Sequence, residues 1–148
     1  MDAFRLASVE QSLSRAAERT GDITVPVLDR YYGRCPEARA AFDEHSLGNR
    51  AWLEARMVEN SLHCLLRWFE CPGEIEILLA GSVLHHSDIL DVPPMLYSEL
   101  IDATAEVVAE TIPPENARER EVWDTLRREL QELVDRSGKW VHPLAAVR

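Results

Sequence analysis

Histidine is the side chain in this sequence best suited to chemistry, and two of the five histidines are adjacent. His85 and His86 end an apolar segment that comes shortly before the break at Val92-Pro93-Pro94. Because consecutive residues on a helix point in different directions, one ring of the pair can face the core while the other faces solvent. An inward imidazole is a strong neutral-nitrogen ligand for iron, zinc or copper. The pair therefore predicts a ligating histidine, with simple core packing as the alternative.

The cysteines offer less chemistry than the histidines. Three cysteines, Cys35, Cys64 and Cys71, are too few and too odd in number for a secreted disulfide framework, and favour reduced thiols in a cytoplasmic protein. Structural zinc sites use ligand pairs about two to four residues apart, and no such cysteine pair is present. A zinc site made of His63, Cys64, Cys71 and His85 is therefore a weak hypothesis.

Motifs of nucleophilic catalysis or phosphate binding are missing from the sequence. There is no Gly-x-Ser-x-Gly elbow, and the six glycines are scattered singly rather than gathered in a phosphate-binding loop. We therefore assign no catalytic residue and do not predict an enzyme.

Length and charge restrict the organisation and the partners. The 148 residues suit one domain over 1–148, with a core over about 8–137 and a tail over 138–148. Sixteen basic against 26 acidic residues give a net charge of −10, which disfavours nucleic acid and anionic membranes as partners. The first residues lack the basic and apolar regions of a signal peptide, so a cytoplasmic location is expected.

The apolar pattern predicts an all-α fold of about six or seven helices, because apolar residues recur at helical spacing between proline and glycine breaks. A capping-box spacing from Ser8 to Gln11 places the first helix start near Ser8. The clearest periodicity predicts one buried helix face made of Ala51, Ala55, Val58, Leu62, Leu65 and Phe69. The other expected helices cover about 26–35, 36–42, 74–86, 96–108 and 123–133.

One segment has a distinctive spacing that starts at the paired histidines. From His86, a valine follows at +6, a proline at +8 and an aromatic residue, Tyr97, at +11. Upstream, Pro36 is followed six residues later by Phe42, and Trp123 lies near the start of the last expected helix. Together these features resemble the globin family, in particular bacterial single-domain globins and flavohaemoglobin haem domains, over roughly residues 8–137.

The resemblance implies a globin-like fold around a pocket for haem b, with His86 as the proximal iron ligand. His85 is the rival ligand, but choosing it would make the residue six positions later Asp91, a poor haem contact. The remaining cofactor contacts that the resemblance implies are Phe42, which stacks on the haem, with Leu90, Val92 and Tyr97 on the proximal side.

On the distal side, the sequence departs from the flavohaemoglobin pattern. Leu28 stands where that pattern has a tyrosine, and the distal positions of the long helix fall at Leu53 and Met57 or, one residue later, at Glu54 and Val58. We prefer Leu53 and Met57 because an unpaired carboxylate against haem would be costly to bury. The side chains expected on the distal side of the haem, Leu28, Leu53 and Met57, offer no hydrogen-bond donor to a bound gas. Binding of NO and CO depends less on such a donor than binding of O₂ does.

The expected function is therefore a haem-binding globin that binds O₂, NO or CO as a sensor, scavenger or carrier. The alternative is a haem-free, globin-like interaction or signalling module whose core is filled by side chains. No flavin or NAD domain is recognisable in the sequence, so a reductase or signalling partner would be a separate protein. Either a monomer or a homodimer is compatible with the sequence.

Overall fold

The computed structural model describes residues 2–88 and 92–147, without the side chains of 87, 88 and 138–147. This part of the chain contains seven helices and no strand, which confirms the all-α prediction. The helices are α1 (Ala3–Thr20), α2 (Thr24–Arg34), α3 (Glu37–His45), α4 (Arg50–Arg67), α5 (Pro72–Asp88), α6 (Pro94–Ala109) and α7 (Ala117–Val147). In the ranges described, no helix combines the length and apolar character needed to cross a membrane.

Helix α1 begins earlier than the capping-box pattern predicts. Its N-cap is Asp2, whose side chain accepts a hydrogen bond from the Arg5 backbone N–H at 3.1 Å. Ser8 lies inside the helix and is 7% exposed, so the predicted start near Ser8 is wrong. An aspartate at the N-cap accepts a hydrogen bond from a backbone N–H of the first turn that would otherwise be unpaired. This capping lets the helix form upstream of Ser8.

The predicted apolar face of α4 is buried at Val58 and Leu65, as is Phe69 just after the helix, but the prediction fails in the first turns of α4. Ala51 and Ala55 are exposed, whereas Glu54 is only 9% exposed. The Glu54 carboxylate accepts a hydrogen bond from the Tyr32 hydroxyl at 2.6 Å and lies 3.6 Å from the Arg50 guanidinium. The other buried residues of α4 are Val58, Ser61, Cys64 and Leu65. Burial of Glu54 is tolerated because its charge and lone pairs have partners.

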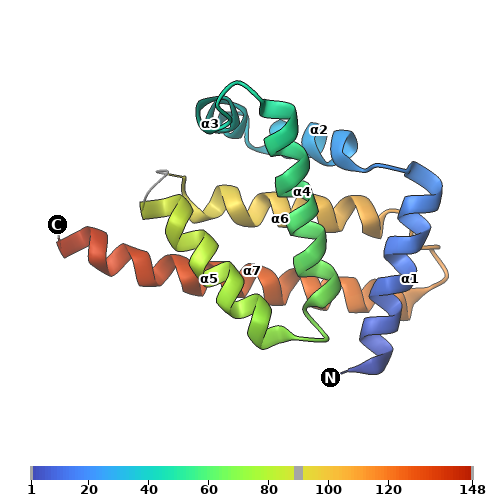
Figure 1. Cartoon of the computed structure of the whole chain (residues 1–148). Coiled ribbons are helices and arrows are strands. Elements are labelled where there is room, and N and C mark those ends of the chain that lie inside the picture. The colour runs from blue at the N-terminus through green and yellow to red at the C-terminus, as the bar shows by residue number, and fades with distance from the viewer. Residues whose placement is uncertain (1, 89–91, 148) are drawn as a thin grey trace.

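The other helices pack around the antiparallel pair α6 and α7. Figure 1 shows α6 and α7 running in opposite directions, with α4 crossing them and α5 crossing α7 obliquely in its C-terminal half. Helix α2 packs on α6, and α1 packs on both α4 and α7. The core between these helices includes the fully buried side chains of Val9, Val58, Leu65, Leu79, Val108, Trp123, Leu126 and Leu130.

The turn between α5 and α6 joins the paired histidines to the start of α6. Pro93 has an extended backbone and caps α6, and Pro94 occupies its first turn, where a missing N–H is harmless. The Val92 backbone N–H donates to the His86 carbonyl at 2.7 Å. This contact holds the C-terminal end of α5 beside the N-terminal end of α6. Helix α7 continues past the expected core boundary at 137, through to Val147.

A buried polar cluster links α1 to α7. The Trp123 indole N–H donates to the Ser12 hydroxyl at 2.8 Å, and that hydroxyl donates to the Glu119 carboxylate. Arg15 adds two hydrogen bonds to Glu119, at 2.7 and 3.2 Å. The Glu119 side chain is 3% exposed and that of Arg15 is 15% exposed. The carboxylate is therefore removed from water but fully provided with donors.

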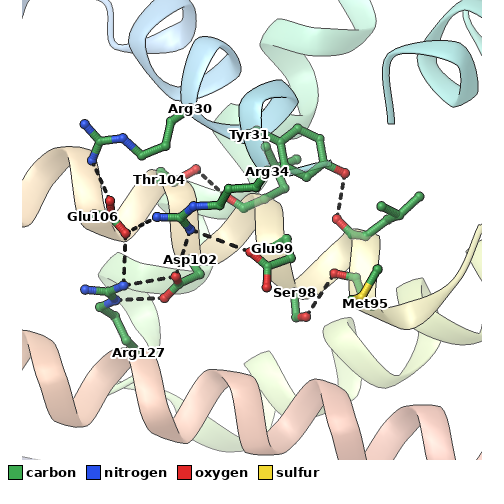
Figure 2. A network of polar contacts seen from close by, with 12 residues as sticks. Arg30, Tyr31, Arg34, Met95, Ser98, Glu99, Asp102, Thr104, Glu106 and Arg127 are labelled. Atoms are coloured by element: carbon green, nitrogen blue, oxygen red, sulfur yellow. Dashed lines mark hydrogen bonds and ion pairs between the residues drawn. The ribbon is translucent and has the colours of Figure 1, made fainter. Parts of the chain in front are cut away.

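A second, more exposed polar network joins α2, α6 and α7. Figure 2 shows Arg127 of α7 reaching Asp102 and Glu106 of α6, which Arg34 of α2 approaches from the other side. Arg127 makes a two-pronged contact with Asp102, at 2.7 and 3.0 Å. Such forked pairs are the stronger class of surface ion pair.

Replacing Arg127 with alanine is expected to lower the free energy of unfolding by about 1 kcal/mol, because the pairs are partly exposed and screened by solvent. Denaturant titration measures the change. The deficit should shrink as salt is added, since salt weakens exposed ion pairs in the wild type. Arg128→Ala, at the neighbouring exposed position, is the matched control. Equal losses of unfolding free energy in Arg127→Ala and Arg128→Ala would show that the ion pairs of Arg127 (Figure 2) do not cause the loss.

Candidate functional site

The main candidate site is an apolar cavity of about 460 Å³ between the α3–α4 region and the α5–α6 turn. Ligand pockets in proteins typically measure about 300–1,000 Å³, so the cavity is large enough for a substantial organic molecule. Its lining residues are Tyr31, Ala38, Ala41, Phe42, Glu44, His45, Leu47, Leu53, Met57, His85, His86, Val92, Leu96, Tyr97 and Leu100.

Most of the residues singled out in the sequence lie around this one cavity. Phe42 comes from α3, Leu53 and Met57 from α4, and Val92 from the turn before α6. His86, with its rival His85, and Tyr97 complete the group. These residues come from four helices and one turn between Phe42 and Tyr97, so their meeting is a property of the tertiary fold.

Other residues of the predicted site lie elsewhere. Leu28 is buried at 8% exposure in the core, and it is not among the described residues that line the cavity. The same holds for Glu54 and Val58, the alternative distal pair, which are also buried away from it. Leu90 lies outside the described residues.

The ring of His86 is held in one tautomer. Its Nδ1 lies 2.7 Å from the Ser82 carbonyl oxygen, which can only accept, so Nδ1 carries the proton and Nε2 carries the lone pair. Burial lowers the pKa of His86 from its ordinary value; the hydrogen bond to Ser82 opposes this, while the charges of His85 and His45 add to it. His86 therefore presents a neutral nitrogen donor, whereas His85 is exposed.

Tyr97 supports the same ring from a second side. The His86 and Tyr97 ring centroids are 5.0 Å apart at an interplanar angle of 64°. Burial raises the pKa of Tyr97 to about 12, against the opposing effect of a hydrogen bond with the Ser82 side chain. Ser82 thus contacts His86 through its carbonyl and Tyr97 through its hydroxyl. Ligating histidines in proteins commonly have such partners, which fix the orientation and the tautomer of the ring.

The sequence reasoning missed Ser82, Tyr31 and His45. Ser82 precedes His86 by one helical turn, and this i−4 spacing is the signal that could have identified it. Tyr31 is 3% exposed and donates its hydroxyl proton to the Leu96 carbonyl at 2.7 Å, a contact visible in Figure 2. His45 comes from the last turn of α3, and no pattern in the sequence relates it to His86.

The described residues give no support to a zinc site. None of their His, Cys, Asp and Glu side chains form a group of three or more that could hold a metal ion. Cys64 is buried, and burial raises the pKa of its thiol to about 11, which keeps it protonated. His63 points to solvent. A thiol must lose its proton to ligate zinc, so Cys64 is poorly placed for that role.

Comparison of the chain with protein-family models, curated proteins and solved structures found no significant match. The chemistry of the cavity is therefore inferred from its own residues.

Proposed function

We propose that this protein is a haem-binding member of the globin family that binds a diatomic gas at the iron, as a sensor, scavenger or carrier. The observation that carries the proposal is that His86, with its tautomer fixed by Ser82, lines an apolar cavity of about 460 Å³. A neutral imidazole nitrogen in an apolar pocket is the donor arrangement that haem iron uses. The resemblance described from the sequence supports the same ligand.

The residues present fit a large, flat, apolar cofactor. Phe42, Leu53, Met57 and Val92 supply apolar surface for a porphyrin, and Nε2 of His86 supplies the lone pair for iron. When bound, haem iron supplies a further coordination position at which a diatomic gas binds. The alternative of a haem-free module, in which side chains fill the core, is less favoured because the cavity between these residues is open.

His86 is a better ligand than His85 in this arrangement. His86 is half-buried, its ring is fixed by Ser82 and Tyr97, and its pKa is lowered by burial, so it stays neutral. His85 is exposed, and its ring lies 5.8 Å from the His86 ring at nearly a right angle. Loss of side-chain freedom on binding iron is smaller for a ring that is already held in place.

The remaining wall of the cavity is poor in groups that would donate a hydrogen bond to a gas ligand. Leu53 and Met57 are apolar, and the Tyr31 hydroxyl already donates to a backbone carbonyl. His45, which the sequence did not predict at this site, is a further polar side chain in the lining of the cavity. This composition favours ligands that need little hydrogen bonding, such as CO and NO, over O₂.

Titrating the purified protein with haem tests the proposal. The expected result is a saturable Soret absorbance at one haem per chain, with a further spectral change when the reduced complex is exposed to CO. Binding should also raise the melting temperature, because a ligand that binds only the folded state stabilises it. A Soret change that does not saturate, or that matches free haem mixed with an unrelated acidic protein, would contradict the proposal.

A further inference from the structure

The turn between α3 and α4 carries a residue that is unfavourable in two ways. Leu47 has φ 53°, and it is the one non-glycine position with positive φ among the residues that the structure describes. Its side chain is also 97% exposed. The left-handed region disfavours L side chains, and an exposed leucine gains nothing from packing. Departures of this kind from local rules are concentrated at functional sites.

The contacts of the turn keep Leu47 in this conformation. The Asn49 backbone N–H donates to the Ser46 carbonyl at 3.1 Å, and the Asn49 side chain caps α4 by accepting from the Trp52 N–H at 3.2 Å. Across the turn, Arg50 pairs with Asp43 at 2.8 Å. The ends of α3 and α4 are therefore tied together, and the chain between them must turn through residues of positive φ.

The strained side chain lies at the edge of the candidate cavity. Leu47 is one of the lining residues, together with Glu44 and His45 from the preceding turn of α3. Buried residues such as Tyr31, Leu96 and Leu100 line the interior of the cavity, whereas Leu47 and Glu44 are exposed and so mark its mouth. An apolar molecule in the cavity would give Leu47 a packing surface that the side chains around it do not provide.

We propose that Leu47 is a cofactor-retaining residue, whose side chain covers the outer edge of the bound porphyrin and slows its escape. The inference rests on the proposed haem function and assigns the α3–α4 turn as the closing element of that site. Without a bound cofactor, the backbone strain and the exposed apolar side chain of Leu47 are both unfavourable to the folded state. When the porphyrin is bound, it covers the apolar side chain of Leu47, and this burial offsets the cost of the strained backbone.

The test compares Leu47→Asn with the wild type by following haem transfer to an excess of a haem-scavenging apoprotein. Asparagine tolerates positive φ but removes the apolar contact. The variant should lose haem at least about tenfold faster, because asparagine removes the apolar contact that a leucine side chain makes with the porphyrin. The ligand-free variant should melt about 2–4 °C higher, because the backbone strain is relieved.

Two further variants make the result specific. Leu47→Met keeps an apolar side chain and should retain haem nearly as long as the wild type. Val25→Asn removes another exposed apolar side chain, 66% exposed on α2 and outside the described lining of the cavity, and should leave the release rate unchanged.

The outcomes separate this inference from the proposed function. If the wild type shows no saturable Soret absorbance, the haem function is wrong and the role of Leu47 falls with it. If the wild type binds haem and Leu47→Asn releases it at the wild-type rate, the retaining role alone is wrong. Faster release from Val25→Asn as well would also overturn it, since the effect would then follow surface hydrophobicity rather than the cavity mouth.

Discussion

Replacing His86 with alanine is expected to abolish tight haem binding while leaving the helical fold in place. Losing an outer-shell partner of a metal ligand typically weakens binding about 10–100-fold, and losing the ligand itself should exceed that range. The ligand-free fold should be little affected, because His86 is only partly buried and its hydrogen bond to Ser82 lies within α5. Haem titration followed by Soret absorbance measures the affinity, and far-ultraviolet circular dichroism checks the fold.

His85→Ala is the matched control for this experiment. It removes an equally large imidazole one residue away, at an exposed position that also borders the cavity. Its haem affinity and Soret position should stay close to those of the wild type. Added imidazole should partly restore the wild-type spectrum of His86→Ala, since it can supply the missing nitrogen in the space left by the side chain. A wild-type spectrum in His86→Ala, with loss of binding in His85→Ala, would reverse the ligand assignment.

A large loss of stability is expected when the buried polar cluster between α1 and α7 is disrupted. Glu119→Ala should lower the free energy of unfolding by about 3–5 kcal/mol, the range seen when one partner of a buried ion pair is removed. The variant leaves Arg15, 15% exposed, without its carboxylate partner and leaves the Ser12 hydroxyl without its acceptor on α7. Denaturant unfolding monitored by tryptophan fluorescence measures the loss.

The same carboxylate should make stability depend on pH in the acid range. Burial alone would raise the pKa of Glu119, but the hydrogen bonds from Arg15 and Ser12, with the charge of Arg15, hold it below the ordinary glutamate value. A carboxyl whose pKa is lower in the folded state stabilises that state above its unfolded-state pKa. This stabilisation is lost as the pH falls from the ordinary glutamate range through the lower native pKa.

Glu119→Gln separates the charge from the hydrogen bonds. The amide oxygen can still accept from Ser12 and Arg15, so the variant should fall between the wild type and Glu119→Ala at neutral pH. Because glutamine does not titrate, the stability difference between wild type and Glu119→Gln should narrow as the pH falls. A difference that stays constant from neutral to acid pH would show that the ionised form of Glu119 contributes nothing.

The helical architecture follows from local features that a sequence displays directly. Proline and glycine positions mark most helix boundaries, and apolar residues at helical spacing mark the helices, so the all-α class was predictable. The spacing from His86 through Val92 to Tyr97 is also local. It drew attention to the segment that the structure places along one side of the cavity.

Other features were decided by packing between distant segments. The buried face of α4 includes Glu54 because Tyr32 and Arg50 provide partners for its carboxylate, and neither partner can be inferred from helical periodicity. Leu28 is apolar and lies on the expected face of α2, yet it packs in the core, while Tyr31, one turn further along, lines the cavity. Spacing predicts which side of a helix is buried, but not what it is buried against.

By itself, the sequence determined the all-α class and most of the breaks between helices, and it drew attention to the segment from His86 to Tyr97, because these depend on residue type and short-range spacing. Only the tertiary structure decided that His86 carries its lone pair on Nε2, that Ser82 and Tyr97 hold its ring, and that Leu47 lies strained at the mouth of the same cavity. These properties depend on distances and backbone angles set by the packing of whole helices, and residue type alone does not specify them.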